Sequence, residues 1–370
     1  MRKRADFHLF QPGKAYRENQ SILVAGCGTS QAAKYAVRWP EATVTGIDVS
    51  PTSIDATNAL KAQHRLDNLT VRELPIEAVS ELGQTFDLVV CTGVLHHLAA
   101  PDAGLSALKS VLAPDGAMHV MVYARYGRTG IYMLQDYCRR LGIEPTSKGI
   151  AELAQSLKLL PGYHPLVPLL RESPDFQNEA ALADALLNPQ DRPYTVEEFF
   201  RFLDGAGLHF ARWIRQAEYS PECGLFRHSP HRSTLHGLTG REAAAAVELF
   251  RGTLARHSAV AYHDGSETCD PGELLSGENW TRLVPIRRPD TLVITEKLPP
   301  GAAAVLINRA HTQTDVFLPI DAEKKRVLEA IDGTRAAGDI DAGSLSREAL
   351  CRYLKVLWTH DQILFDASAV

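Results

Sequence analysis

The feature that most constrains this chain is a short glycine-rich turn after an apolar run near the N-terminus. The run Ser21–Ala25 leads directly into Gly26, Cys27 and Gly28, and Asp48 closes a second apolar run 20 residues after Gly28. A pair of glycines lets the backbone turn sharply and lie against a ligand that a side chain would exclude. An acid at the end of the second strand accepts hydrogen bonds from ribose hydroxyls. Together these features predict a nucleoside-type cofactor at the carboxyl edge of a parallel sheet.

The surrounding segment, 21–123, alternates short apolar runs with amphipathic stretches. Runs rich in valine, leucine and isoleucine suit strands that are covered on both faces. Strands that alternate with helices indicate an α/β fold with a parallel, doubly wound, Rossmann-like sheet. We expect strands at 21–25, 42–47, 69–73, 86–91 and 117–123, with helices at 29–39, 51–63 and 103–112.

The type of cofactor follows from the third position of the glycine motif. A dinucleotide needs a third glycine so that its pyrophosphate can approach the helix N-terminus, and this chain has Gln31 there. A bulky side chain at this place argues against a pyrophosphate and fits a cofactor without phosphate. S-adenosylmethionine is such a cofactor, since it consists of adenine, ribose and a methionine tail with a sulfonium.

Four sequence blocks in the right order then resemble the core of the class I S-adenosylmethionine-dependent methyltransferases, of the UbiE-like kind. The blocks are ILVAGCGTS, GIDVS, FDLVVCTGVLHHL and LAPDGAMHVMVYA. The resemblance covers roughly the first 265 residues, most strongly about 100 of them. It implies methyltransferase activity and a seven-stranded sheet with an antiparallel last strand, which 208–213 and 258–262 can supply, each after a helix (196–205 and 241–256).

The resemblance also implies roles for individual residues around the cofactor. The methionine tail and ribose would lie against the glycine turn, the ribose hydroxyls on Asp48, the adenine beside the ends of the second and third strands, and the sulfonium above the end of the fourth. This chain departs from the family at Ser30, where a glycine is common, and at Pro75, where many members have an acid. The cofactor-binding set that it implies is Gly26, Cys27, Gly28, Gln31, Asp48, Val49, Leu74, Pro75, Ile76, Thr92 and Gly93.

Candidate catalytic groups follow the fourth and fifth strands. His96 and His97 come after strand 86–91, and a histidine near its ordinary pKa can act as a general base. The alternative is that one histidine packs beneath its loop and the other caps the next helix. Tyr123 ends strand 117–123 and would face the same pocket, so we name it with the two histidines as a catalytic candidate.

Candidate acceptor-binding residues come from three segments. Arg125 could hold an acceptor carboxylate or phosphate, although solvent exposure is the alternative. The stretch 189–194 is dense in polar and rigid residues just before a predicted helix, and could instead be a helix-entry loop. An N-terminal tyrosine could fold over the mouth of the cofactor site. The predicted substrate-binding set is Tyr16, Arg125, Tyr126, Gln190, Arg192 and Tyr194.

Changes in the periodicity of apolar residues and in composition divide the chain into segments. Residues 1–20 are an N-terminal arm, and 21–265 form the predicted methyltransferase domain, with a helical cap insertion at about 128–193 (helices 130–142, 149–159 and 179–187). Asp, Gly, Ser and Glu dominate 265–279, which predicts a linker. Residues 280–370 predict a small α+β accessory domain that faintly resembles winged-helix modules, with extended runs 283–286, 291–295, 304–307 and 316–320 and helices 322–332 and 346–357.

Composition excludes several classes of function. A net charge of −5 argues against a broad nucleic-acid-binding face. No run of 18 apolar residues and no secretory h-region occur, so we expect a cytoplasmic protein without membrane contact. The spacing of Cys223, His228, His231 and His236 matches no standard zinc pattern, so no metal is expected.

The leading hypothesis is a methyltransferase that acts on a small molecule beneath its cap. One alternative is a methyltransferase of a peptide or protein docked by the C-terminal domain. Another is a non-catalytic, regulatory protein that binds S-adenosylmethionine. The sequence leaves a homodimer open, and it does not indicate which atom of the acceptor is methylated.

Overall fold

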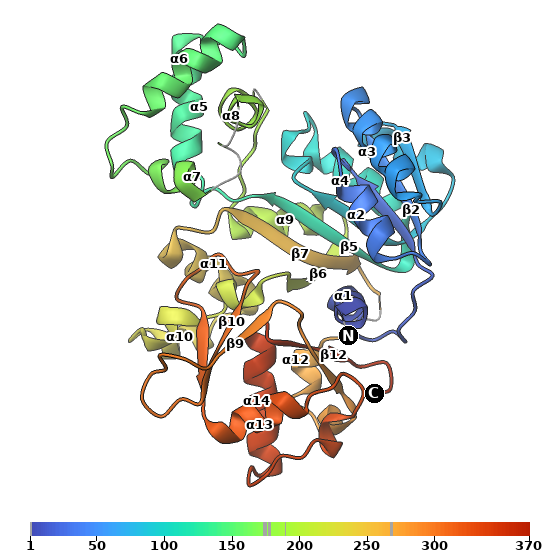
Figure 1. Ribbon diagram of the computed structural model, residues 1–370, viewed down its shortest axis with the longest axis vertical. Helices are drawn as coiled ribbons and strands as arrows, with labels where there is room; N and C mark the ends of the chain where they lie inside the picture. The colour runs from blue at the N-terminus through green and yellow to red at the C-terminus, as the bar shows by residue number, and fades with distance from the viewer. Residues whose placement is uncertain (1, 173–175, 177–178, 189, 267–268) are drawn as a thin grey trace.

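A seven-stranded sheet forms the centre of the molecule in the computed structural model, which describes residues 2–370 except 173–175, 177–178, 189 and 267–268 (Figure 1). The strand order is β3-β2-β1-β4-β5-β7-β6. Strands β1 to β5 pair in parallel, whereas β7 is antiparallel to both β5 and β6. The predicted Rossmann-like sheet with an antiparallel last strand is therefore confirmed. Its strands are β1 (Ser21–Ala25), β2 (Thr43–Asp48), β3 (Leu69–Glu73), β4 (Phe86–Thr92), β5 (Leu112–Tyr123), β6 (Leu208–Trp213) and β7 (Arg256–His263).

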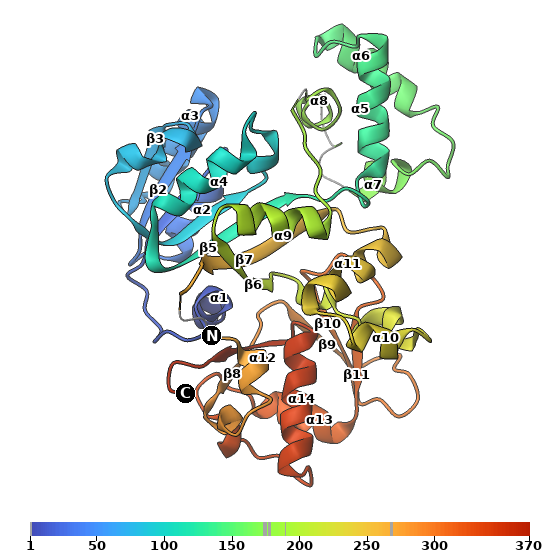
Figure 2. The ribbon, with the colours of Figure 1, turned by 180° about the vertical axis from the view of Figure 1, so that it is seen from behind.

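Helices cover both faces of this sheet, which explains its unbroken apolar strands. Ile22 and Val24 of β1 pack toward α1 and α2 in one cluster, and Leu23 and Ala25 pack toward α4 and α9 in another. Both views of the ribbon show the sheet between the two layers (Figures 1 and 2). The covering helices are α1 (Arg2–Phe10), α2 (Gln31–Arg38), α3 (Pro51–His64), α4 (Pro101–Ser110), α9 (Val196–Gly205) and α11 (Gly240–Arg251).

Local signals place the ends of several elements. Helix α3 begins where the Ser50 side chain accepts a hydrogen bond from the Ser53 amide and Pro51 occupies the first turn. Helix α11 ends at Arg251, five residues earlier than the sequence predicts, because Gly252 adopts a left-handed φ of 63° that caps the helix. The freed residues allow β7 to begin at Arg256, two residues before the predicted start.

The cap is a separate helical lobe beyond the carboxyl edge of the sheet (Figure 1). It has a small apolar core of its own, which includes Ile131, Leu153 and Leu186. The chain returns to the sheet at Tyr194, whose amide donates to the carbonyl of Tyr123 at 3.0 Å. Helices of the cap are α5 (Thr129–Leu141), α6 (Ser147–Leu157), α7 (Val167–Glu172) and α8 (Glu179–Leu187), of which α7 is not predicted by the sequence.

The C-terminal part is a small α+β unit with two antiparallel sheets, β11-β10-β9 and β12-β8. Its own core includes Trp280, Leu306 and Leu354. Its elements are α12 (Pro271–Leu274), β8 (Val284–Arg287), β9 (Thr291–Ile294), β10 (Ala304–Asn308), β11 (Phe317–Ile320), α13 (Ala322–Ala330), α14 (Arg347–Thr359) and β12 (Ile363–Asp366). The predicted linker partly lies outside the described residues, and α12 forms within it. A winged-helix character stays a prediction.

The remaining short helical turns connect these elements. They are η1 (Ile76–Leu82), η2 (Leu95–His97), η4 (Gln216–Tyr219), η5 (Gly224–His228), α10 (Arg232–His236), η6 (Asn279–Arg282) and η7 (Ala337–Asp339). None of the helices in the described part of the chain is long and apolar enough to cross a membrane.

Candidate functional site: a cofactor cavity at the sheet edge

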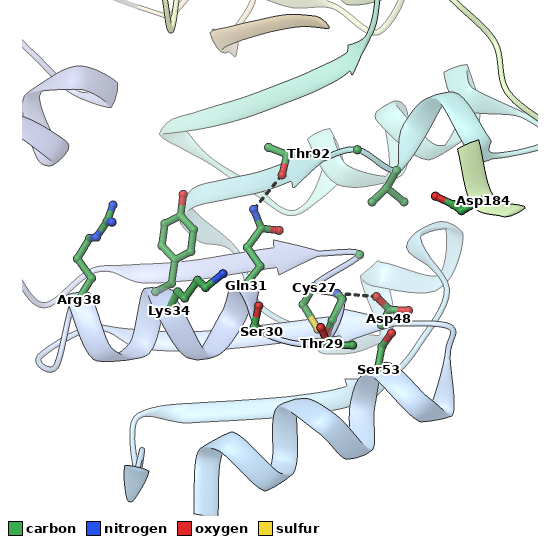
Figure 3. A pocket seen from close by; sticks show the side chains of 15 residues that line it. Cys27, Thr29, Ser30, Gln31, Lys34, Arg38, Asp48, Ser53, Thr92 and Asp184 are labelled. Atoms are coloured by element: carbon green, nitrogen blue, oxygen red, sulfur yellow. Dashed lines mark hydrogen bonds between the residues drawn. The ribbon is translucent and has the colours of Figure 1, made fainter. Parts of the chain in front are cut away.

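A cavity of about 770 Å³ opens at the carboxyl ends of β1, β2 and β4 (Figure 3). This volume lies within the range of ordinary small-ligand and cofactor sites. The lining comes from the turn after β1, the start of α2, the end of β2, the end of β4 and one residue of the cap. It consists of Gly26, Cys27, Gly28, Thr29, Ser30, Gln31, Lys34, Tyr35, Arg38, Asp48, Ser53, Thr92, Gly93, Val94 and Asp184.

The glycine turn supplies the floor of this cavity. Gly26 and Gly28 adopt φ angles of +66° and +54°, in the left-handed region that L side chains rarely occupy. A Cβ atom on Gly26 would also lie only 2.3 Å from Cγ2 of Val94. Both the close approach and the backbone conformation therefore require glycine at position 26.

Asp48 is fixed at the edge of the cavity by two backbone amides. Its Oδ2 accepts from the Gly28 amide at 2.8 Å, and its Oδ1 accepts from the Ser50 amide at 2.9 Å (Figure 3). Each carboxylate oxygen has a second lone-pair direction that can accept from a ligand hydroxyl. The arrangement holds a negative charge in place to receive a diol such as a ribose.

Gln31 and Thr92 separate the cofactor cavity from a second, smaller chamber. The Gln31 side-chain amide donates to Oγ1 of Thr92 at 2.8 Å, and both residues line both spaces. The chamber has a volume of about 220 Å³ and lies over β5 and β7, beside η4. Its other lining residues are His119, Met121, Ile214, Arg215, Glu218, Tyr219, Arg256 and Ser258.

These residues fit S-adenosylmethionine, because the cavity combines a glycine floor, a fixed carboxylate and enough volume. Of the cofactor set expected from the sequence, the cavity is lined by Gly26, Cys27, Gly28, Gln31, Asp48, Thr92 and Gly93. Val49 is exposed beside it, Leu74 and Ile76 are buried, and Pro75 is exposed, and none of these four is among the lining residues. Their contact with adenine stays a prediction.

The catalytic candidates gather after β4 and at the end of β5, and none of them is among the residues that line the cavity or the chamber. The ring centroid of His96 lies 4.1 Å from that of His97 and 4.0 Å from that of Tyr123. Burial lowers the pKa of His96 to about 2, with smaller contributions from His97 and Arg128. His96 is therefore neutral and a weak proton acceptor in this arrangement. A base role for His97 or Tyr123 stays a prediction.

Arg125, the first substrate-binding candidate after β5, forms an ion pair within the protein. Arg125 donates to both carboxylate oxygens of Glu198 at 3.0 Å, at the start of α9. This ion pair engages one nitrogen of the guanidinium, and a contact between Arg125 and an acceptor anion stays a prediction. Tyr126 is exposed next to it.

The polar stretch before α9 is divided between surface and core. Gln190 is exposed, and its carbonyl oxygen contacts Nδ1 of His97 at 3.1 Å. The guanidinium carbon of Arg192 lies 4.9 Å from the ring centroid of Tyr194. Tyr194 is fully buried and packs against Phe202, so its placement in the core corrects the prediction that it contacts substrate. Pro189, which begins the stretch, lies outside the described residues.

The prediction for Tyr16 is corrected by its position in the fold. Its hydroxyl donates to Glu18, and its ring packs against Phe7. The next residue, Arg17, pairs with Asp87 at the beginning of β4. This segment therefore runs along the amino edge of the sheet, opposite the cofactor cavity, because it connects α1 to the first residue of β1.

Several lining residues were missed by the sequence analysis. Asp184 reaches the cavity from α8, more than 130 residues after the glycine turn, and no motif marks it. Arg256 lines the small chamber because β7 pairs antiparallel with β5 and sets it opposite Tyr123. Arg256 could have been identified from the sequence only if the β5–β7 register had been known. Glu218 lies in a 3-10 turn, for which the sequence carries no periodic signal.

Comparison with known proteins agrees with this site. Residues 23–118 match the family model described as methyltransferase domain. This segment contains the glycine turn, Asp48 and the end of β4. The chain therefore contains a class I, S-adenosylmethionine-dependent methyltransferase domain.

Individual relatives share parts of the chain. A Synechococcus protein, syc1184_c, is 33% identical over 208 residues, which are 54% of this chain and 50% of that protein. A ubiquinone biosynthesis O-methyltransferase of Brucella anthropi is 35% identical over 104 residues, 28% of this chain and 41% of the relative. The chain thus spans about half the length, or less, of these curated relatives.

Among solved structures, PKMT2 from Rickettsia typhi has a similar fold over nearly the whole chain. The TM-score is 0.64 at 15% sequence identity, and the superposition covers 96% of this chain and 73% of that one. A second structure of PKMT2, in complex with AdoHcy, aligns equally well, with a TM-score of 0.64 over 97% of this chain and 73% of that one at 14% identity. At this level of identity the likeness shows the fold alone.

Proposed function

We propose that this protein transfers the methyl group of S-adenosylmethionine to an acceptor molecule. The observation that carries the proposal is the cavity at the sheet edge, where a left-handed glycine turn faces a carboxylate held by two amides. A regulatory protein that binds the cofactor without catalysis is less well supported. Such a site is expected to have lost part of its binding motif, and Gly26, Gly28 and Asp48 are all present.

The bound cofactor would supply a methyl group on a positively charged sulfur. An acceptor atom would take this methyl group by in-line displacement, with the electron pair of the broken carbon–sulfur bond left on sulfur. The protein's contribution is to hold both partners close and aligned. Asp48 and the glycine turn would fix the nucleoside, and the Gln31–Thr92 pair would lie between the cofactor and the small chamber.

The first candidate acceptor is a small molecule. It is supported by the polar groups His96, His97 and Tyr123, which come from the loops after β4 and β5 and lie next to the cap. A helical lobe at this edge of the sheet can enclose a small acceptor and exclude water from the reaction.

The second candidate acceptor is a protein side chain, which one specific observation favours. The chamber of about 220 Å³ has room for one side chain, and its charged lining residues are Glu218, Arg215 and Arg256. Glu218 also accepts from the amide of Thr312, so it joins the chamber to the C-terminal unit.

Two measurements test the proposal. Calorimetric titration with S-adenosylmethionine and S-adenosylhomocysteine is expected to show micromolar binding of both. Incubation with methyl-labelled cofactor and a cell lysate, followed by separation of small molecules from proteins, then identifies the acceptor class. Binding without transfer to either fraction would favour the regulatory alternative, and absence of binding would reject the cofactor assignment.

The two acceptor classes are separated further by Glu218→Gln. If a protein side chain enters the chamber, this change lowers protein labelling and leaves the affinity for S-adenosylhomocysteine unchanged. Glu222→Gln is the matched control, because Glu222 lies nearby in the chain and does not line the chamber. Equal labelling by both variants would count against the protein acceptor.

A further inference from the structure

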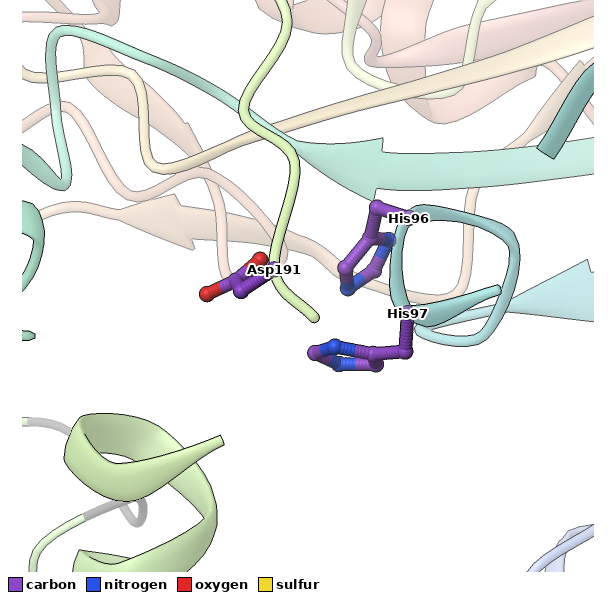
Figure 4. Close-up of side chains that lie close together, drawn as sticks. All are labelled: His96, His97 and Asp191. Atoms are coloured by element: carbon purple, nitrogen blue, oxygen red, sulfur yellow. The ribbon is translucent and has the colours of Figure 1, made fainter. Parts of the chain in front are cut away.

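Three side chains with metal-binding atoms converge between the core and the cap. They are His96 and His97 of η2, and Asp191 on the segment that returns from the cap (Figure 4). One ligand atom from each residue lies within 4.8 Å of the others. The sequence gives no sign of this group, since Asp191 is 94 residues from His97 and forms no standard motif with it.

Two of these side chains carry buried polar atoms that lack a partner. His96 is 1% exposed, and neither of its ring nitrogens has a hydrogen-bond partner among the described residues. The same holds for Oδ1 of Asp191. A buried polar atom without a partner destabilises the folded protein. A shared ligand would remove this destabilisation for His96 and Asp191 together.

Neighbouring residues contact the side chains of His97 and Asp191 and help to orient their metal-binding atoms. Nδ1 of His97 lies 3.1 Å from the carbonyl oxygen of Gln190, and this shorter contact supports the tautomer with the hydrogen on Nδ1 and the lone pair on Nε2. The amide nitrogen of Asn188 is a longer contact, at 3.3 Å. Oδ2 of Asp191 accepts from the side-chain amide of Gln135 at 3.0 Å, which leaves Oδ1 available. Metal-bound histidines and carboxylates typically have such supporting hydrogen bonds.

We propose that His96, His97 and Asp191 bind one divalent transition-metal ion of the Zn²⁺ type. Two imidazoles and one carboxylate suit Zn²⁺ or a similar ion, whereas Mg²⁺ and Ca²⁺ prefer oxygen ligands alone. Zinc bonds to nitrogen and oxygen are about 2.0–2.2 Å long, so the ligand atoms must approach to roughly 3.3 Å. His97 is only partly buried, which leaves room for a small shift of its side chain toward the other two ligands.

The positive charge of Arg128 lies close enough to His96 to contribute to its lowered pKa. Its guanidinium carbon lies 3.5 Å from the ring centroid of Tyr123, where the electrons of the ring stabilise it.

A site with three protein ligands leaves one coordination position open, as catalytic zinc sites do. The ion would join η2 to the segment between the cap and α9, and so would hold the cap in place. If the proposed methyltransferase function holds, the open position could also receive an acceptor oxygen or nitrogen next to the cofactor cavity. This last step rests on the proposed function, whereas the metal site does not.

The test uses the full-length protein after dialysis against a chelator. Titration with Zn²⁺ alone is followed by calorimetry, and titration with Co²⁺ by visible absorption. We expect one ion per chain, and at least tenfold weaker binding in His97→Asn and in Asp191→Asn, because each variant removes one ligand. Gln135→Ala should weaken binding by about 10–100-fold through loss of the supporting hydrogen bond. His64→Asn, on the exposed end of α3, is the control and should bind like the native protein.

Either of two results would overturn the metal site: no binding of one ion per chain, or equal affinity in His97→Asn and His64→Asn. Circular dichroism shows whether each variant is folded. Titration of the same samples with S-adenosylhomocysteine keeps the two proposals apart. Metal binding without cofactor binding would reject the methyltransferase function and retain the metal site, and the reverse result would do the opposite.

Discussion

Asp48 is the single side chain on which the cofactor assignment most depends. We expect Asp48→Ala to weaken the binding of S-adenosylhomocysteine by roughly 1.5–3 kcal/mol, or about 10–150-fold, because charge-assisted hydrogen bonds to the ribose are lost. The change also releases the Gly28 amide, which Asp48 holds at 2.8 Å. Calorimetry measures the effect, with the exposed Asp55→Ala in the adjacent helix as control. An unchanged dissociation constant for Asp48→Ala would remove this residue from the site.

Gly26 makes a second prediction at this scale. In Gly26→Ala the new Cβ would meet the Val94 side chain at 2.3 Å, in a backbone conformation with φ of +66°. The left-handed backbone alone costs about 1–2 kcal/mol. We therefore expect urea unfolding to show a loss of at least about 2 kcal/mol, together with weaker cofactor binding. Gly162→Ala is the control, since an added Cβ meets no atom within 4 Å there. Equal stability of the two variants would contradict the close packing of the turn.

The sequence identifies site residues that lie close together along the chain. It misses site residues that reach the cavities from distant parts of the chain. The glycine turn and Asp48 lie within one strand–turn–helix unit and its neighbour, so their spacing alone indicates their position. Asp184 and Arg256 reach the two cavities from distant elements, through the cap and the β5–β7 register. Tyr16 shows the opposite error, because nothing local indicates toward which edge of the sheet an N-terminal arm runs.

At the scale of elements, α9 links the cap segment to the sheet through its first turn. The Thr195 hydroxyl accepts from the Glu198 amide at 3.2 Å, and the Glu198 carboxylate accepts from the Thr195 amide at 2.8 Å. Thr195→Ala should destabilise the protein by about 1 kcal/mol in urea unfolding, because the N-cap hydrogen bond is lost. Thr195→Ser keeps the oxygen and should be nearly neutral. A loss as large in the serine variant would show that the methyl group, and not the cap, stabilises this turn.

The sequence predicts whether a segment is a helix or a strand more reliably than it predicts where that helix or strand begins and ends. Continuous apolar runs mark β1 and β4, because strands buried on both faces tolerate few polar residues. The first part of β5 was missed, since Pro114, Asp115 and Gly116 indicate a turn although the strand begins at Leu112. Helix α7 has only six residues, too few for a periodic pattern to show.

At the scale of the whole molecule, the C-terminal unit packs directly on the methyltransferase domain. Ala5 and Leu9 of α1 share an apolar cluster with Ile286 of β8 and Leu364 of β12. A composition-based linker at 265–279 suggests a loose tether, but composition does not show that the N-terminal helix is covered from the far end of the chain.

Asp361 holds this junction together from a fully buried position. Its Oδ1 accepts from Arg212 of β6 at 3.1 Å and lies 3.5 Å from Arg288, and its Oδ2 accepts from the Ala217 amide at 3.0 Å. Asp361→Asn leaves two buried arginines without their counter-ion. We expect a loss of about 3–5 kcal/mol in stability, measured by urea unfolding against the exposed control Asp339→Asn.

The same carboxylate predicts how stability depends on pH. Burial by itself would raise the pKa of Asp361, but the hydrogen bond from His311 and the charges of Arg288 and Arg212 lower the pKa below its usual value of 3.8. The unfolded chain therefore takes up a proton at this residue at a higher pH than the folded protein does. The stabilisation from Asp361 is complete above about pH 5 and is lost progressively as the pH falls further. Urea midpoints measured from pH 7 to pH 3 should decline more steeply for the native protein than for Asp361→Asn. Parallel curves would show that the junction owes its stability to apolar packing and not to this charge.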